Sequence, residues 1–219
     1  MHPIPEHVYE MAKERASKQK VFERSHRGAE ANEVGCLGEA VAEEWMNNRG
    51  ITFTAKLEET THDYLISDSL TLDVKTKDRT VVPKKYYDNS APMYNHTHQR
   101  PDYFLFISLE RERADEEGDI RRFHTAYILG SISYEELDRV GIPFLKDEID
   151  WRNKTKFWTD CLNVEMWQLI PLNETVQIFK GLQLSPTKST SINKVVIEEI
   201  SRRIKDGSMK PRDLPKSQD

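Results

Sequence analysis

The sequence predicts a single α/β domain in which a sheet is flanked by helices, because helix and strand patterns alternate along the chain without an internal repeat or a linker. Residues 29–48 carry apolar side chains at helical spacing: Val34, Leu37, Val41 and Trp45. Residues 103–109 are instead an almost unbroken apolar run, which is typical of a strand buried on both faces.

The N-terminal half is expected to be divided between helices and strands. Two helices are expected, over residues 5–24 (exposed and charged) and 29–48 (ending at Arg49-Gly50). Period-two alternation predicts three strands, over residues 51–57, 63–66 and 70–76. Residues 80–100 contain two prolines and mixed polar residues, and a short helix with a loop is expected there.

The C-terminal half gives fewer signals. Strands are expected over residues 103–109, 123–129 and 166–170, with an exposed charged connection over 110–122. Ser133 and Glu136 form a capping-box pattern that predicts a short helix ending near Gly141. An amphipathic helix is expected over 192–204. The domain is expected to span residues 1–206, followed by a disordered polar tail over 207–219.

Composition favours a soluble protein with a modest core. Hydrophobic residues make up 37% of the 219 and charged residues 32%. No apolar run approaches the roughly 20 residues that span a bilayer, so no membrane association is expected. The first residues show no secretory signal, and two cysteines, Cys36 and Cys161, are too few for a disulfide framework. A cytoplasmic location, with both thiols reduced, is expected.

The charge of the chain gives conflicting indications about binding to nucleic acid. The formal net charge of −5 argues mildly against it, because proteins that bind nucleic acid usually carry an excess of Lys and Arg. Basic residues nevertheless cluster locally, and one cluster directly follows the strand over 70–76: Lys77, Arg79, Lys84 and Lys85. These four residues are candidate nucleic-acid contacts. The alternative is that they form an ordinary solvated face.

The strand over residues 70–76 presents an acid and a lysine together. Side chains alternate between faces with period two, so Leu72 and Val74 are expected to point into the core. Asp73 and Lys75 then share the opposite face. An acid and a cation are thus placed side by side on a strand whose other face is anchored.

A second acid is expected opposite Asp73. If residues 67–69 form a tight hairpin centred on Asp68, Asp63 pairs with Asp73 across the two strands. Cross-strand partners have Cβ atoms about 4.5–5.5 Å apart. Two carboxylates placed so close repel each other, and a divalent cation relieves that repulsion. Hard oxygen ligands suit Mg²⁺, for which Mn²⁺ can substitute.

The helix over residues 29–48 supplies a third acid. Gly35 and Gly38 are unfavourable inside a helix by about 1 kcal/mol each, which suggests close packing against another element. A helix lying tightly on the sheet would bring Glu39 toward the two aspartates. Glu43, one turn further on, is a rival for the same role.

In their order, these residues resemble the PD-(D/E)XK nuclease superfamily, particularly its phage-type and recombination exonuclease-like branches. The motifs are Gly38-Glu39, His62-Asp63-Tyr64 and Asp73-Val74-Lys75-Thr76, within residues 28–109. The resemblance implies a restriction-endonuclease-like core, with a central mixed sheet flanked by helices, and a C-terminal extension. It also implies metal binding by Glu39, Asp63, Asp73 and the carbonyl of Val74, with Lys75 near the attacking water.

The sequence departs from the family pattern at two points. His62 stands where the proline that names the motif would be, and the Gln or Tyr that often follows the lysine has only Gln99 and Tyr94 as possible counterparts. The expected function is Mg²⁺-dependent hydrolysis of DNA by Glu39, Asp63, Asp73 and Lys75, with no small-molecule cofactor. A phage-encoded protein acting in a bacterial host is a plausible setting.

Other functions remain open at this point. The fold could persist as a catalytically silent nucleic-acid-binding module, or the carboxylates could merely solvate a protein-interaction surface. A zinc site built from His62, His96, His98 or Cys36 lacks the spacing of known zinc motifs. The choice between DNA and RNA, between internal cutting and cutting from ends, and the oligomeric state are not determined.

Overall fold

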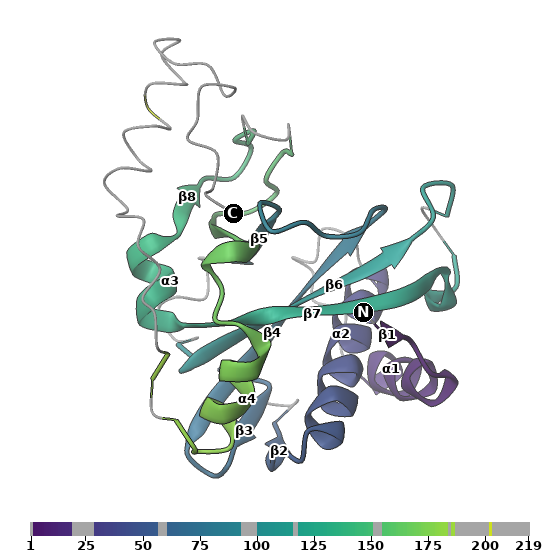
Figure 1. Cartoon of the computed structure of the whole chain (residues 1–219). Coiled ribbons are helices and arrows are strands. Elements are labelled where there is room, and N and C mark those ends of the chain that lie inside the picture. Colours follow the sequence, from purple (N-terminus) through teal and green to yellow (C-terminus); the bar gives the residue numbers. More distant parts are fainter. Residues whose placement is uncertain are drawn as a thin grey trace.

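The main sheet of the computed structural model has six strands in the order β1–β7–β6–β4–β3–β2 (Figure 1). Their bounds are His2–Pro3 (β1), Phe123–Ser133 (β7), Tyr103–Arg111 (β6), Leu70–Arg79 (β4), Tyr64–Ile66 (β3) and Phe53–Ala55 (β2). The structure describes residues 2–18, 29–56, 61–92, 100–115, 118–150, 155–183, 185–186 and 202. β4 and β6 run parallel, whereas the other neighbouring pairs are antiparallel. The expectation of an α/β fold with a mixed sheet is therefore confirmed.

β6 lies between two hydrophobic cores. Its residues 103–109 are all buried, as the apolar run predicts. Leu105 and Ile107 pack with the helices on one face of the sheet. Phe104 and Phe106 pack with a second sheet on the other face. Both faces of this strand are covered, so its sequence does not alternate between apolar and polar residues.

The second sheet has three antiparallel strands in the order β5–β9–β8. They are Asp88–Pro92 (β5), Cys161–Glu165 (β9) and Ile142–Phe144 (β8). Ala91, Leu162 and Val164 on this sheet pack against the phenylalanines of β6. The helix α3 (Tyr134–Val140) leads into it, and the Ser133 hydroxyl caps that helix by accepting from the Glu136 N–H, as predicted.

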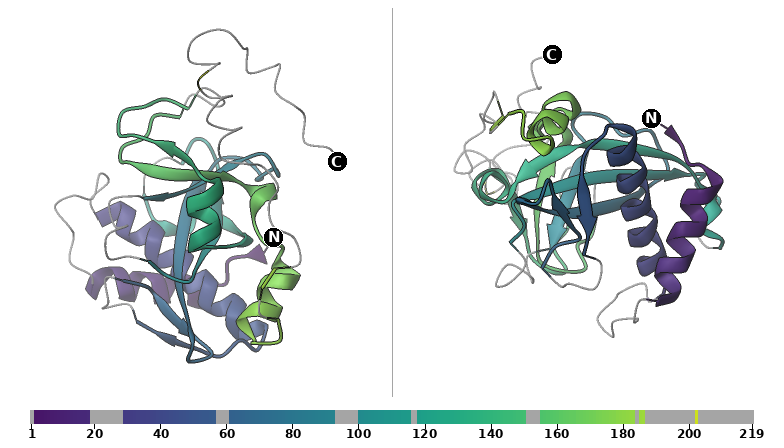
Figure 2. Two further views of the ribbon diagram at one scale, coloured as in Figure 1. Left: turned by 90° about the vertical axis from the view of Figure 1, so that its left-hand side faces the viewer. Right: turned by 90° about the horizontal axis from the view of Figure 1, so that it is seen from below.

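Helices cover the opposite face of the main sheet. α1 (Glu6–Lys18) and α2 (Ala29–Asn48) lie side by side, and α4 (Leu172–Phe179) covers another part of the same face (Figure 2). α1 is less exposed than its charge suggests, because Val8, Tyr9 and Ala12 are buried in this core. No helix in the described ranges has the length and apolar character that crossing a bilayer requires.

Two sequence expectations are wrong, and one helix was missed. The strand β5 lies where a short helix was expected within residues 80–100, and residues 93–99 are not described. The strand expected over 166–170 is found earlier as β9, because Glu165 and Gln168 cap a short 3₁₀ turn, η2 (Met166–Gln168), that ends it. The helix α4 was not anticipated. The helix expected over 192–204 and the tail over 207–219 lie outside the described residues, apart from Arg202.

α2 approaches β4 so closely that only glycine fits at position 38. A Cβ atom built on Gly38 would lie 1.8 Å from the Thr76 hydroxyl oxygen. The close packing inferred for Gly38 is thus confirmed. At Gly35 it is not, since a Cβ there has no described atom within 4 Å.

Replacing Gly38 with alanine is expected to destabilise the protein, because the new methyl group would overlap Thr76. Overpacking costs about 1–3 kcal/mol, and each kcal/mol lowers the Tm by about 2–4 °C for a protein of this size. Gly35→Ala is the matched control and should be neutral or stabilising, since alanine favours a helix by about 1 kcal/mol over glycine. Thermal melts compare the two variants. Equal Tm values would contradict the assigned contact.

Candidate active site

The strand β4 carries the centre of the candidate site. Asp73 is almost fully buried, with 2% of its surface exposed, and Lys75 Nζ lies 2.5 Å from Asp73 Oδ2. Lys75 Nζ also lies 6.0 Å from the ring centroid of Phe104 on the neighbouring β6. Leu72 and Val74 are buried in the core under the helices. The predicted division of this strand into an apolar face and an acid–lysine face is therefore present.

The hairpin between β3 and β4 has the predicted register. Tyr64 pairs with Leu72 and Ile66 with Leu70, so the hairpin is centred on Asp68. Ser67 and Asp68 have positive φ values of 48° and 55°, and the Ser69 N–H donates to the Ile66 carbonyl at 3.0 Å. Such a turn, with left-handed central residues, matches the twist of the two strands and sets their register.

Asp63 lies one residue beyond the last paired residue of β3. Its backbone N–H donates to the Leu72 carbonyl at 2.9 Å. Its carboxylate Oδ2 accepts from the Val74 N–H at 2.7 Å. Where the pairing of β3 with β4 ends, the side chain of Asp63 therefore continues it by accepting a hydrogen bond from β4. This bond holds the Asp63 carboxylate next to Asp73.

The half-buried Asp63 and the buried Asp73 form an acidic pair. Burial raises the pKa of Asp63 well above its ordinary value, and the charges of Asp73 and Glu39 raise that pKa further, as does a hydrogen bond with the Asp73 side chain. The Lys75 ammonium opposes this effect. Folding without a bound metal ion therefore favours the protonated form of Asp63.

Glu39 reaches the same cluster from α2. It follows Gly38, whose close contact with Thr76 fixes the distance between helix and strand. Burial raises the pKa of Glu39; the positive charge of Arg15 lowers it, whereas Asp73 raises it. Glu39 Oε2 is buried and has no hydrogen-bond partner among the described residues. A buried, unpartnered carboxylate oxygen is costly unless a ligand or cation completes it.

The rival acid Glu43 is already engaged. Its Oε2 lies 2.6 Å from Arg15 Nη2, and both side chains are largely buried. Arg15 Nη1 also donates to the Tyr64 hydroxyl at 3.5 Å, and that hydroxyl donates to the Glu39 carbonyl at 3.1 Å. Glu39, rather than Glu43, is the α2 acid within electrostatic reach of both Asp63 and Asp73. Sequence reasoning missed Arg15 because it is one of several basic residues in the N-terminal segment.

The donor chemistry of the cluster fits a hard divalent cation. Glu39, Asp63 and Asp73 offer carboxylate oxygens, and one of these oxygens, Glu39 Oε2, is buried without a hydrogen bond. In the present conformation Asp73 is paired with Lys75, and Asp63 with the Val74 N–H. Consistent with this, no three acidic, histidine or cysteine side chains in the described ranges converge as a ready-made metal site. Ligation would need these carboxylates to turn away from their present partners.

The candidate nucleic-acid contacts divide into two groups. Lys77 forms an ion pair with Asp88 of β5, and burial lowers the pKa of Lys77. Arg79 donates to Ser108 Oγ at 2.9 Å and to the Asp88 carbonyl at 2.5 Å. These two residues therefore tie β4 to its neighbours.

Lys84 and Lys85 are exposed in the loop that joins β4 to β5, here called the 80–87 loop. The same loop exposes apolar and aromatic side chains: Val81, Val82 and Tyr86. Of the alternative site residues, His62 lies beside Thr61, with 2.9 Å between His62 Nδ1 and the threonine hydroxyl. Tyr94, His96, His98 and Gln99 lie outside the described residues.

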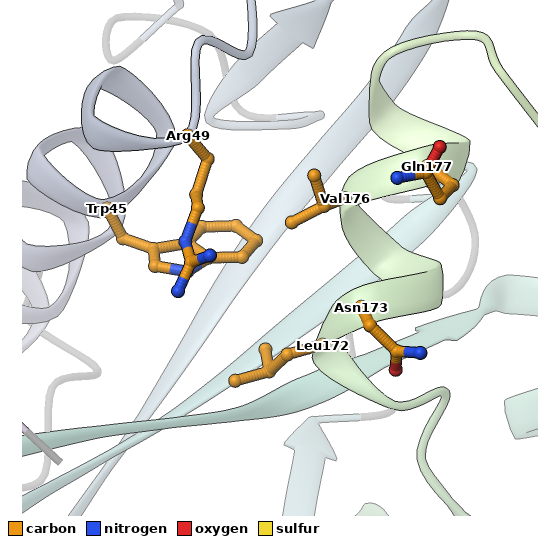
Figure 3. Close-up of a pocket in the computed structure, with 6 residues that line it drawn as sticks. All are labelled: Trp45, Arg49, Leu172, Asn173, Val176 and Gln177. Atoms are coloured by element: carbon orange, nitrogen blue, oxygen red, sulfur yellow. The ribbon is translucent and has the colours of Figure 1, made fainter.

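A separate hollow lies between α2 and α4 (Figure 3). It has a volume of about 310 Å³ and is lined by Trp45, Arg49, Leu172, Asn173, Val176 and Gln177. Trp45 and Arg49 on α2 face Leu172 and Val176 on α4 (Figure 3). The lining contains no acid, nucleophile, histidine or cysteine, and we assign no chemistry to the hollow.

Asp63→Asn tests the acidic pair through stability. A carboxyl whose pKa is raised by folding costs stability once the pH exceeds its unfolded value, and this condition holds at pH 7. The variant should therefore melt at or above wild type in EDTA, since the amide oxygen can still accept from Val74. A cation that binds only the folded protein stabilises it by about 2.7 kcal/mol at 100 times its Kd. Wild type should gain this from saturating Mn²⁺.

In the same melts, Asp63→Asn should gain much less from Mn²⁺ than wild type does. Asp68→Asn is the matched control, because Asp68 is exposed at the hairpin turn and asparagine tolerates its positive φ. That control should keep the full gain. An Asp63→Asn protein that gains as much as wild type would remove Asp63 from the site.

No protein-family model matches this chain, and no curated protein matches it significantly. The resemblance to the PD-(D/E)XK superfamily therefore depends on the ordered set of Glu39, Asp63, Asp73 and Lys75. What the chain can do has to be inferred from the geometry and chemistry of those residues.

Proposed function

We propose that this protein is a divalent-metal-dependent nuclease that hydrolyses phosphodiester bonds in DNA, with Mg²⁺ as the cofactor and Mn²⁺ as a substitute. The observation that carries the proposal is the cluster of the half-buried Glu39, Asp63 and Lys75 around the buried Asp73. These residues come from a helix, a hairpin end and a strand; Lys75 contacts Asp73, and Asp63 is bonded to the Val74 N–H between them in the chain. On this proposal the core is restriction-endonuclease-like, and Val74 supplies its carbonyl as a further ligand.

The chemistry divides between a bound cation and the chain. The cation would lower the pKa of a water molecule and neutralise charge that develops on the phosphoryl oxygens. Glu39, Asp63 and Asp73 would hold it. The Val74 N–H holds Asp63 beside Asp73, a contact that the Asp63 carboxylate would give up on binding the cation. Lys75, beside Asp73, donates hydrogen bonds that orient the attacking water and stabilise the transition state.

The 80–87 loop is the best candidate for substrate contact. It carries Lys84, Lys85 and the exposed Tyr86, and no acidic residue. Lysines interleaved with aromatic residues suit phosphates and bases. Six residues of strand separate Asp73 from Arg79, which is roughly 20 Å at about 3.3 Å per residue. The loop would therefore contact nucleic acid roughly six nucleotides from the scissile bond, at about 3.4 Å per nucleotide.

A catalytically silent nucleic-acid-binding module is the second candidate. The ion pair between Asp73 and Lys75 favours it, because it satisfies the strand acid without a metal. The two candidates make opposite predictions about cleavage. They share the prediction that the 80–87 loop binds nucleic acid.

Cleavage assays decide between these candidates. Linear, circular and single-stranded DNA, and RNA, would be incubated with Mg²⁺, Mn²⁺ or EDTA. We expect cleavage only with a divalent ion. Asp73→Asn should abolish cleavage and weaken Mn²⁺ binding in calorimetry. Lys75→Met should abolish cleavage yet leave Mn²⁺ binding largely intact, because an ammonium group is not a metal ligand.

Three outcomes would contradict parts of this proposal. Cleavage that survives excess EDTA would rule out the metal mechanism. Loss of Mn²⁺ binding in Lys75→Met as complete as in Asp73→Asn would give Lys75 a structural role. Binding of DNA without cleavage under any metal would favour the silent module.

Charge reversal in the 80–87 loop tests substrate binding. The double variant Lys84→Glu/Lys85→Glu should raise the KM for DNA at least tenfold while leaving kcat nearly unchanged, because these residues lie away from the acids. The slope of log affinity against log salt should fall by about two, one for each lost phosphate contact. Lys146→Glu, an exposed lysine beyond β8, is the control and should change neither value by as much. Equal effects of the two variants would mean that the loop has no special role.

A further inference from the structure

Arg15 of α1 connects two elements that carry acids of the site. Its Nη2 lies 2.6 Å from Glu43 Oε2, and its Nη1 donates to the Tyr64 hydroxyl at 3.5 Å. Glu43 lies one turn beyond Glu39 on α2. Tyr64 directly follows Asp63 in sequence. One guanidinium therefore contacts the immediate neighbours of two proposed metal ligands.

The Tyr64 hydroxyl extends this connection. It accepts from Arg15 and donates to the backbone carbonyl of Glu39 at 3.1 Å. Tyr64 is fully buried, so its ring has no freedom to leave this position. The start of β3 is thus fastened to α2 at the residue that carries the third acid.

These contacts are sheltered from water. The side chains of Arg15 and Glu43 are 16% and 10% exposed. Removing one member of a buried ion pair leaves the other charge uncompensated. Without Arg15, the Glu43 carboxylate would face Glu39 from one turn away, and its Oε1 already has no hydrogen-bond partner among the described residues.

We propose that Arg15 is a positioning residue for the acidic site, acting through Glu43 and Tyr64 to hold Glu39 and Asp63 in register. This inference depends on the proposed nuclease function. Arg15 does not need to touch substrate in this role. Its planar guanidinium can hold a carboxylate and a hydroxyl at once, which the point charge of lysine cannot do in the same way.

The alternative is that Arg15 only holds α1 against the rest of the protein. Arg121 provides a comparison that tests this alternative. Arg121 also anchors α1, because it pairs with Glu6 and Glu10 on the exposed side of that helix. The acidic partners of Arg121 are Glu6, Glu10 and Asp119, and none of them belongs to the site. Loss of either arginine should loosen α1, and only loss of Arg15 should disturb the acids.

The test uses the full-length protein with Arg15→Lys, Tyr64→Phe, the double variant, and Arg121→Lys as the matched control. At saturating Mn²⁺, Arg15→Lys should lower kcat by about tenfold to a hundredfold, since misplacement by about 1 Å costs on that order. The KM for DNA should stay within about threefold. Tyr64→Phe should lower kcat in the same direction.

The double variant should be little worse than Arg15→Lys, because both changes break one connected set of contacts. Arg121→Lys should leave kcat unchanged even where its Tm falls as far as that of Arg15→Lys.

Each contrary result has a distinct meaning. An unchanged kcat in Arg15→Lys, or an equal loss in Arg121→Lys, would overturn the positioning role while leaving the nuclease proposal intact. A tenfold rise in KM with normal kcat would overturn it in favour of direct substrate contact. Strictly additive losses in the double variant would also overturn it. Wild-type protein that neither cleaves DNA nor binds Mn²⁺ in calorimetry would refute the nuclease function and this inference with it.

Discussion

The close approach of α2 to β4 is the constraint on which the rest of the site depends. The contact between Gly38 and Thr76 leaves no room for a Cβ atom, so the helix lies directly on the strand. The contact has a different consequence for the residues on each side of Gly38. Leu37 and Leu72 become part of one buried core, and Glu39 comes within electrostatic reach of Asp73. A bulkier residue at position 38 would overlap Thr76 and push α2, with Glu39, away from β4.

Gathering acids in this way costs stability. Burial and mutual repulsion raise the pKa values of Asp63 and Glu39, so the folded protein favours their neutral forms. The chain offsets part of this cost with two cations, Arg15 on the α1 side and Lys75 on the β4 side. A site that is unfavourable until a ligand arrives is typical of functional positions, where local stability is given up for binding. On the proposed function, a divalent ion supplies the remaining positive charge.

The second sheet determines what the rest of β4 can do. β5 lies close to the far half of β4, and Asp88 binds both Lys77 and Arg79. Two basic residues of β4 are thereby used in contacts inside the protein. The exposed basic residues of this region are instead Lys84 and Lys85 in the 80–87 loop. Consequently, the acidic cluster and the exposed basic loop lie at opposite ends of β4. β4 pairs along its length with β6, which is itself packed between two cores.

The sequence alone determined those features that depend on short-range geometry. The helix over residues 29–48, the hairpin register centred on Asp68, the two faces of β4 and the cap at Ser133 all follow from periodicity and turn chemistry within a few residues. The tertiary structure decided what depends on distant partners. β5 and β9 are short strands that lie far apart in the sequence, with Asp88 paired with Glu165, and β9 also pairs with β8. Likewise, Arg15 is one basic residue among several until folding places it beside Glu43, because no local pattern specifies which buried charge will meet which partner.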